Sequence, residues 1–398
     1  MKKQFVIIGA SAAGVAAAAR LRMIDQEASI ICISDEAEFP YNKCFLAEYL
    51  SGLKEISHLN IKSDTFFEDA RIELVLNTKI IKIDKELKKI IAHNGKEFVY
   101  DKLLYATGGS LKVLPLKGID AQGVFEFYTL KDTQNILEYA QKQTTEHVVI
   151  IGAGLSGMEC ADALLGYVKK ITIVDMQKHV LFRLVPEDAA CFLQNKMEEH
   201  GVLFVPHTTV KEIIHTHGIV TSVICSDGST IQADMVVCAL GAQPNSQLAR
   251  DAGLIINNNL VVTNSFLQTS DPHIFAAGDV IQTCDQHTKK EVKSCTWPDA
   301  LMQGGCAAFN MAGIEKEYGG VTIIAFSEFF GMKFYVTGNC KEISMSHTTT
   351  LRKTADSYRL IVAKSLVVQG FLLIGNSEHF ASLKRSLILQ QQCDTVIS

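Results

Sequence analysis

Residues 147–175 of this chain, HVVIIGAGLSGMECADALLGYVKKITIVD, are the stretch that decides the fold. The apolar run at 147–151 is typical of a buried parallel strand, and a glycine-rich turn follows it. Residues 155–168 favour a helix, and a second β-branched run then ends in an aspartate. This order predicts a βαβ unit of the Rossmann type, and therefore an α/β fold.

The turn itself has the spacing G-x-G-x-x-G, formed by Gly152, Gly154 and Gly157. The first glycine makes the tight turn, the second lets backbone N–H groups approach a pyrophosphate, and the third lets the helix pack closely on the strand. Phosphates would then lie at the positive end of the helix that begins near Leu155. The pattern predicts a dinucleotide site.

Asp175 stands at the end of the second strand, where Rossmann units carry an acid. A carboxylate there accepts hydrogen bonds from a ribose 2′-hydroxyl and repels a 2′-phosphate. No arginine follows it directly, so the sequence favours NADH over NADPH, although Lys178 leaves NADPH open.

Residues 5–36 repeat the same plan with a less regular turn, GASAAG at 9–14. The outer glycines remain, and a serine replaces the middle one. A small residue still permits the backbone to approach a phosphate. Among the acids after the second strand, Glu36 is the one expected to bind a ribose. The residues expected to form this turn are Gly9, Ser11, Ala12, Ala13 and Gly14.

The correspondence continues downstream, because residues 77–109 match residues 208–242 in the order of strand-like runs and polar turns. This similarity predicts an internal duplication of a nucleotide-binding domain. A strand-like piece at 260–280 has no second copy and is expected to return to the first domain. We therefore expect domain segments at 1–115, 116–244 and 245–318, the last rejoining the first, and a small C-terminal α+β domain at 319–398.

Composition narrows the class of protein. A length of 398 residues predicts more than one domain, and a net charge of −5 with pI near 6.2 offers no basic surface for nucleic acid. No stretch reaches the roughly 18–20 apolar residues of a membrane span. Lys2, Lys3 and the apolar run after them imitate a signal peptide, but the run fits the strand and helix better. We expect a cytoplasmic protein.

The eleven cysteines form no C-x-x-C pair and stand singly in apolar surroundings. This distribution indicates reduced thiols in a reducing compartment, and it argues against structural zinc or iron–sulfur ligation. No metal is expected.

Five motifs follow one another along the chain, and the third of them contains the second glycine turn. They are YATGG at 105–109, TLKDT at 129–133, GAGLSGME at 152–159, LGAQPN at 240–245 and FAAGDV at 275–280. With these, the chain over about residues 4–320 resembles the pyridine nucleotide–disulfide oxidoreductase superfamily. Within it, the chain is most similar to the NADH-dependent rubredoxin and ferredoxin reductases and to the flavin portion of assimilatory nitrite reductase. The resemblance implies that the 9–14 turn binds FAD and the 152–157 turn binds NAD(H).

The resemblance also implies roles on the FAD side. Thr107 and Gly108 would close over FAD, Asp279 would bind its ribityl and pyrophosphate portion, and the backbone near Ile80 would meet the adenine. The stretch SDEAEFPYNK at 34–43 also resembles a family segment, and this resemblance implies that Lys43 lies along FAD.

The segment at 294–313 resembles the one that brings a helix N-terminus to the flavin, where its positive end would stabilise charge on the reduced ring. It implies that Trp297 covers the flavin ring, whereas a purely structural tryptophan is the alternative. On the NAD side, Gly241 belongs to the LGAQPN motif, and Glu159 would orient the nicotinamide carboxamide, with an ordinary helix glutamate as the alternative.

The chain also departs from its relatives. The closely spaced cysteine pair of disulfide reductases is absent, and alignment puts Glu48 where single-cysteine relatives carry their redox cysteine. Cys44 lies four residues earlier, so a catalytic thiol stays open, although a buried and inert thiol is favoured.

The leading hypothesis is thus an FAD-dependent NADH:acceptor oxidoreductase, in which hydride passes from NADH to flavin N5 and electrons leave to a rubredoxin- or ferredoxin-like protein. One alternative is a Cys44-dependent NADH oxidase or peroxidase, or a coenzyme A disulfide or persulfide reductase. The other is a flavin- and NAD-binding protein that controls an interaction. The sequence does not decide whether the protein is a homodimer.

Overall fold

The computed structural model describes residues 2–112, 115–142, 144–286, 289–338, 340–341 and 347–392. The chain divides into two compact units, of which the first contains residues 1–45, 55–110 and 242–321 and the second contains 46–54, 111–241 and 322–398. Cys393 lies outside the described residues.

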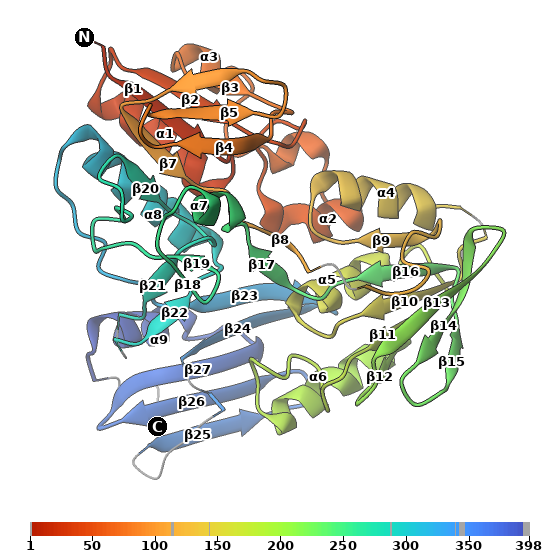
Figure 1. Cartoon of the computed structure of the whole chain (residues 1–398). Helices are drawn as coiled ribbons and strands as arrows, with labels where there is room; N and C mark the ends of the chain where they lie inside the picture. The colour runs from red at the N-terminus through yellow and green to blue at the C-terminus, as the bar shows by residue number, and fades with distance from the viewer. Residues whose placement is uncertain are drawn as a thin grey trace. The chain divides into compact units, whose positions relative to one another are not determined.

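The first unit is built on a five-stranded parallel sheet in the order β20-β7-β1-β2-β3 (Figure 1). Strand β20 comes from the last segment of the unit and pairs with β7, so residues far apart in sequence complete one sheet. The strands of this sheet are β1 (Gln4–Ile8), β2 (Ser29–Ile33), β3 (Glu73–Val75), β7 (Lys102–Tyr105) and β20 (Ile274–Ala276).

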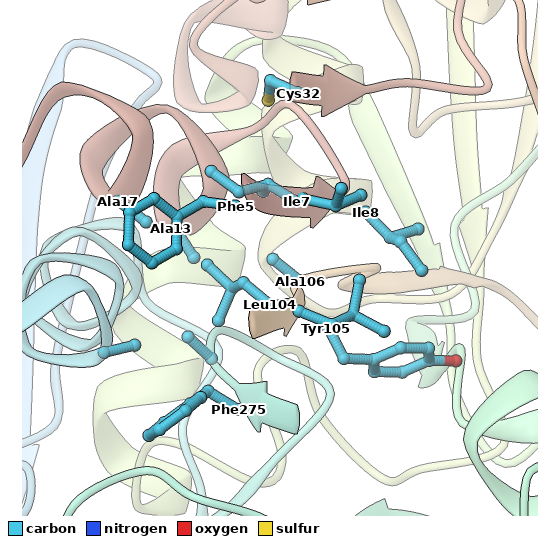
Figure 2. Packing of buried hydrophobic residues seen from close by; sticks show 14 of the residues in the cluster. Phe5, Ile7, Ile8, Ala13, Ala17, Cys32, Leu104, Tyr105, Ala106 and Phe275 are labelled. Atoms are coloured by element: carbon cyan, nitrogen blue, oxygen red, sulfur yellow. The ribbon is translucent and has the colours of Figure 1, made fainter. Parts of the chain in front are cut away.

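The core of this unit joins the sheet to two helices, α1 (Ala12–Ile24) and α8 (Trp297–Ala312), and it also contains Ile83, Ile90 and Phe98. Figure 2 shows Ala13 and Ala17 of α1 beside Phe5 of β1. Alanines on this face let the helix lie close to the sheet. The two helices also touch closely, because a Cβ on Gly304 of α8 would stand 2.0 Å from the carbonyl oxygen of Ala13.

The second unit repeats this architecture with a parallel sheet in the order β12-β11-β10-β16-β9. In both units the strand before the glycine turn is central, the strand after the helix lies on one side of it, and a three-stranded antiparallel sheet accompanies the parallel one. The predicted duplication is therefore visible in the topology. The strands are β9 (Val124–Glu126), β10 (His147–Ile151), β11 (Lys170–Val174), β12 (Val202–Val205) and β16 (Met235–Cys238).

The antiparallel sheets are β4-β5-β6 in the first unit and β13-β14-β15 in the second. Their strands are β4 (Ile80–Asp84), β5 (Lys89–Ala92), β6 (Glu97–Val99), β13 (Val210–Thr216), β14 (Ile219–Cys225) and β15 (Thr230–Gln232). The helices of the second unit are α2 (Leu46–Leu50), α4 (Leu130–Ala140), α5 (Leu155–Leu164), α6 (Glu187–Glu199) and α9 (Phe380–Leu389).

The C-terminal part of the second unit is a five-stranded antiparallel sheet in the order β23-β24-β27-β26-β25, drawn in blue in Figure 1. Helix α9 packs on it, as Leu383 and Leu387 share a cluster with Phe371 of β27. The strands are β23 (Ile324–Phe329), β24 (Met332–Gly338), β25 (Thr348–Lys353), β26 (Tyr358–Lys364) and β27 (Val367–Gly375).

The remaining elements are short. They are the helices α3 (Phe66–Asp69) and α7 (Gln247–Asp251), the 3-10 turns Lys43–Phe45 and Ile56–Leu59, and the strands β8 (Gly109–Leu111), β17 (Ala242–Pro244), β18 (Ile256–Asn257), β19 (Leu260–Val261), β21 (Gln282–Cys284) and β22 (Glu291–Lys293).

The predicted fold class, α/β with two Rossmann-like sheets and a small C-terminal α+β part, is confirmed by these sheets. The four domain segments stay a prediction, as does the cytoplasmic location. Within the described residues, no helix is both long and apolar enough to cross a membrane. The ten described cysteines form no disulfide, and the described side chains contain no cluster suited to a metal ion.

Candidate functional site

The first glycine turn joins β1 to α1 and admits only glycine at its ends. Gly9 has φ +105°, and a Cβ on it would stand 2.1 Å from the carbonyl oxygen of Ala106. A Cβ on Gly14 would stand 1.8 Å from the carbonyl oxygen of Gly9. Helix α1 begins at Ala12 after Ser11, whose side chain makes no capping bond, and its first turn has no acid. The free N–H groups there suit an anion.

The second turn joins β10 to α5 with the same construction. Gly152 has φ +114°, and a Cβ on it would stand 2.5 Å from the carbonyl oxygen of Ala239. A Cβ on Gly157 would stand 1.9 Å from the carbonyl oxygen of Gly152, so only glycine fits at this position. By contrast, a Cβ on Gly154, which precedes Leu155 at the start of α5, would meet no atom within 4 Å. The turn therefore leaves open space where a pyrophosphate is expected.

Asp175 follows β11 and is held against this turn. Its Oδ2 accepts a hydrogen bond from the backbone N of Ala153 at 2.7 Å, and its Oδ1 accepts one from Gln177 N at 2.8 Å. Lys178, which kept NADPH open in the sequence, forms an ion pair with Glu187. Because Lys178 pairs with Glu187, the charge beside the turn is that of the Asp175 carboxylate. This negative charge favours a ribose 2′-hydroxyl over a 2′-phosphate.

Gly241 belongs to the same unit and has φ +78°. Its carbonyl oxygen accepts a hydrogen bond from Lys112 N at 3.3 Å.

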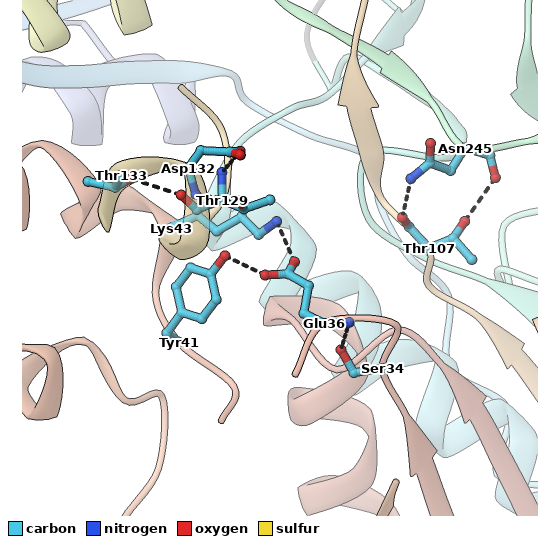
Figure 3. A network of polar contacts seen from close by, with 9 residues as sticks. All are labelled: Ser34, Glu36, Tyr41, Lys43, Thr107, Thr129, Asp132, Thr133 and Asn245. Carbon is cyan, nitrogen blue, oxygen red and sulfur yellow. Dashed lines mark hydrogen bonds and ion pairs between the residues drawn. The ribbon is translucent and has the colours of Figure 1, made fainter. Parts of the chain in front are cut away.

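Glu36, Tyr41 and Lys43 form one polar cluster in the first unit (Figure 3). Lys43 Nζ lies 2.8 Å from Glu36 Oε1, and the Tyr41 hydroxyl donates to Glu36 Oε2 at 2.5 Å. The sequence assigned Glu36 to the ribose and Lys43 to FAD separately. The structure brings the two side chains together and fixes the carboxylate in place.

Asp279 follows β20 in the same unit. Its carboxylate accepts no hydrogen bond from the described residues, and the residue is partly buried. Burial raises its pKa to about 6, while Lys293 and Lys43 lower that pKa and Asp299 raises it. A partly buried carboxylate with open lone pairs and two lysines nearby suits a polyhydroxyl chain that continues into phosphates.

The turn that carries Asp279 is held by α8. Gln303 is buried there, and its Oε1 accepts a hydrogen bond from Gly278 N at 2.7 Å, while its Nε2 donates to the Tyr318 hydroxyl at 3.3 Å. Gln303 therefore fixes the backbone beside Asp279. The sequence gave no sign of this contact, because the resemblance of residues 294–313 implied a helix beside the flavin and no role for Gln303.

Thr107 and Gly108 follow β7, and both bond to Asn245; Figure 3 shows the contacts of Thr107. Thr107 Oγ1 donates to the Asn245 carbonyl oxygen at 3.0 Å, and Asn245 Nδ2 donates to the Thr107 carbonyl oxygen at 3.0 Å. The Asn245 N–H donates to the Gly108 carbonyl oxygen at 3.0 Å. The YATGG and LGAQPN motifs thus bond to each other. Ile80, assigned to the adenine, is the first residue of β4 and is buried.

Trp297 is the first residue of α8 and packs against the core of the first unit. It lines a cavity of about 330 Å³ with Val15 and Ala16 of α1 and with Asn42 and Phe45. Its place beside the flavin ring stays a prediction. Cys44 lies in the neighbouring 3-10 turn, and its side chain is exposed, so the expectation of a buried thiol is wrong.

Glu159 lies on α5 and is not an ordinary surface glutamate. Its Oε1 accepts a hydrogen bond of 2.6 Å from the hydroxyl of Ser327 on β23. Burial raises the pKa of Glu159 to about 7, the Ser327 hydrogen bond lowers it, and the charge of Glu48 raises it. Ser327 carried no signal in the sequence, since it lies 168 residues away in a part without motifs.

Residues 3–304 match the family model described as pyridine nucleotide-disulphide oxidoreductase. The chain belongs to this family. Rubredoxin-NAD(+) reductase of Pseudomonas putida is 31% identical over 77% of this chain and 80% of its own length. The NAD(P)H nitrite reductase of Bacillus subtilis is 29% identical over 94% of this chain and 46% of its own length. The solved NAD-dependent persulfide reductase from A. fulgidus has a TM-score of 0.90 at 26% identity and covers 98% of this chain and 78% of its own.

Family membership confirms that the chain is an NAD(P)H-dependent oxidoreductase with FAD and NAD(P)H as its cofactors. The chain spans about half the length of the nitrite reductase that it matches.

Proposed function

We propose that this chain is an NADH:acceptor oxidoreductase that reduces a small rubredoxin- or ferredoxin-like protein without a catalytic thiol. The first unit holds FAD on the Gly9 turn with Glu36, Lys43 and Asp279, and the second holds NADH on the Gly152 turn. When bound, FAD accepts the hydride of NADH and passes the electrons on singly.

The observation that carries NADH over NADPH is the fixed carboxylate of Asp175. The Ala153 N–H donates to Oδ2 of Asp175 at 2.7 Å, and this hydrogen bond holds the carboxylate beside the second turn. A 2′-phosphate would meet that charge, while a 2′-hydroxyl can donate to it. Lys178 does not offset the carboxylate, since it pairs with Glu187.

The proposed acceptor rests on the likeness to rubredoxin-NAD(+) reductase and on Glu48 at the position of the redox cysteine in single-cysteine relatives. A second candidate is a Cys44-dependent persulfide or disulfide reductase. It is favoured by the exposed side chain of Cys44 and by the likeness to the A. fulgidus persulfide reductase.

A panel of acceptors with NADH as donor separates the two candidates. Cys44→Ser should keep most of the turnover with rubredoxin, ferredoxin and ferricyanide, and Cys191→Ser, which changes another exposed cysteine, serves as the matched control. If the protein turns over persulfides or disulfides faster than iron acceptors, and Cys44→Ser alone abolishes that turnover, the thiol enzyme is correct instead.

A further inference from the structure

Two acids of α5, Glu159 and Asp162, accept hydrogen bonds from the β23–β24 hairpin. Glu159 Oε1 accepts from Ser327 Oγ at 2.6 Å, and one turn later Asp162 Oδ1 accepts from Phe330 N at 2.8 Å. Both acids lie on one face of α5, three residues apart. Ser327 is only 4% exposed, so its hydroxyl is shielded from competing water. The Glu159 carboxyl is therefore fixed through one oxygen, and Oε2 is left for a ligand.

The charged groups around this carboxyl are mostly acids. Glu48 faces it from α2, which packs against α5. Glu328, next to Ser327, faces Glu48 and Asp162. The nearby basic side chains face other acids, since Lys54 faces Glu48 and His200 faces Asp162.

Clustered carboxyls in a desolvated place favour retention of a proton. Burial is the largest cause of the raised pKa of both acids. It raises the pKa of Glu159 to about 7, and it also raises the pKa of Glu48. The carboxyl of Glu159 therefore titrates closer to neutral pH than an ordinary glutamate, and a modest change in its surroundings changes its proton occupancy.

We propose that the Glu159 carboxyl, held by Ser327 and faced by Glu48, gains a proton when reduced nicotinamide occupies the site and loses it when the oxidised ring is bound. This inference rests on the proposed function and on the role that the family resemblance implies for Glu159, which is to orient the carboxamide of the nicotinamide. The proton comes from solvent and returns to solvent, so no bond to the nucleotide is made or broken by it.

The chemistry follows from the charge of the two rings. The reduced ring is neutral and excludes water from the carboxyl, which disfavours the carboxylate. The oxidised ring is a cation, which favours the carboxylate. A protonated Glu159 can also donate to the carboxamide oxygen, whereas the carboxylate only accepts from its NH₂ group. The site would therefore prefer NADH at lower pH and NAD⁺ at higher pH.

Isothermal titration calorimetry of the oxidised holoenzyme in two buffers of unequal ionisation enthalpy measures the protons exchanged. The ligands are NAD⁺ and tetrahydro-NADH, whose neutral ring carries no transferable hydride. Across about pH 6 to 8 we expect NAD⁺ to release a fraction of a proton and tetrahydro-NADH to take up a fraction of a proton, each with a maximum near the pKa of Glu159.

The variants should separate the roles of the neighbours. Glu159→Gln should lose both exchanges, whereas Glu198→Gln, an exposed glutamate of α6, should keep them. Glu48→Gln should move the pH of maximal exchange down, and Ser327→Ala should move it up, because the two neighbours act on Glu159 in opposite senses. Ser327→Thr retains a hydroxyl and should restore the wild-type value.

Binding of both nucleotides without proton exchange, or exchange that persists in Glu159→Gln, would overturn the inference and leave the proposed function standing. A shift in the same direction for Glu48→Gln and Ser327→Ala would also overturn it. If neither nucleotide binds, the proposed function fails, and the inference fails with it.

Discussion

Gly154 offers a test in which binding and folding separate. Its backbone is extended, with φ −80° and ψ −175°, and a Cβ there meets no protein atom within 4 Å. Gly154→Val should therefore fold normally, and the loss of glycine at the helix N-cap should cost about 1 kcal/mol or less. The valine methyl groups would fill the open space in which the pyrophosphate is expected, so the damage should fall on NADH.

The size of the effect follows from the contacts that are lost. A hydrogen bond from a backbone N–H to a charged phosphate contributes about 1.5–3 kcal/mol. Loss of one such bond would raise the Kd for NADH roughly 10- to 100-fold, since about 1.4 kcal/mol corresponds to tenfold. FAD content should stay at the wild-type value, because FAD is assigned to the other turn.

The matched control is Gly154→Ser, because the first turn carries Ser11 at the corresponding position. Equilibrium titration with NAD⁺, flavin content after gel filtration and the melting temperature should be measured on both variants. We expect weak binding for valine and near-normal binding for serine. Wild-type affinity in Gly154→Val, or loss of flavin instead of nucleotide affinity, would refute the assignment of this turn.

Three further outcomes follow from buried polar groups. Gln303→Leu leaves the buried N–H of Gly278 without its acceptor, which should cost about 1–3 kcal/mol in urea unfolding and speed FAD loss on dilution. Asp279→Asn should stabilise the apoprotein by up to about 3 kcal/mol above pH 6 and not below about pH 4. The reason is that the pKa of Asp279 is raised to about 6 in the folded protein, so ionisation of this carboxyl above that pH destabilises the fold. Melting temperatures of both proteins measured across pH check this. Arg22→Met removes a guanidinium that donates to five backbone carbonyls, so denaturant unfolding should show a loss of about 3 kcal/mol or more, and Arg22→Lys should recover part of it.

The glycine turns were predictable because their chemistry is local. Gly9 and Gly152 need a positive φ and no Cβ, and both requirements arise within one strand–turn–helix unit. The acid at position 175 follows from the same unit. Short, strongly patterned segments of this kind specify their own structure, so the two Rossmann-like sheets could be read from the sequence.

The contacts that complete the site were not predictable because they join residues far apart in the chain. Ser327 meets Glu159 across 168 residues, and Gln303 meets Gly278 from a helix that carries no motif for this contact. The exposure of Cys44 was also missed, because apolar neighbours in sequence do not guarantee burial when the segment is a short turn.

The most direct measurement is the anaerobic reduction of the enzyme-bound flavin by NADH and by NADPH, followed by stopped-flow absorbance in the wild type and in Asp175→Ala. We expect rapid bleaching at low concentrations of NADH, at least about tenfold weaker binding of NADPH, and a loss of that difference in Asp175→Ala. A purified protein without flavin, or flavin reduced equally well by NADPH in the wild type, would contradict the proposed function.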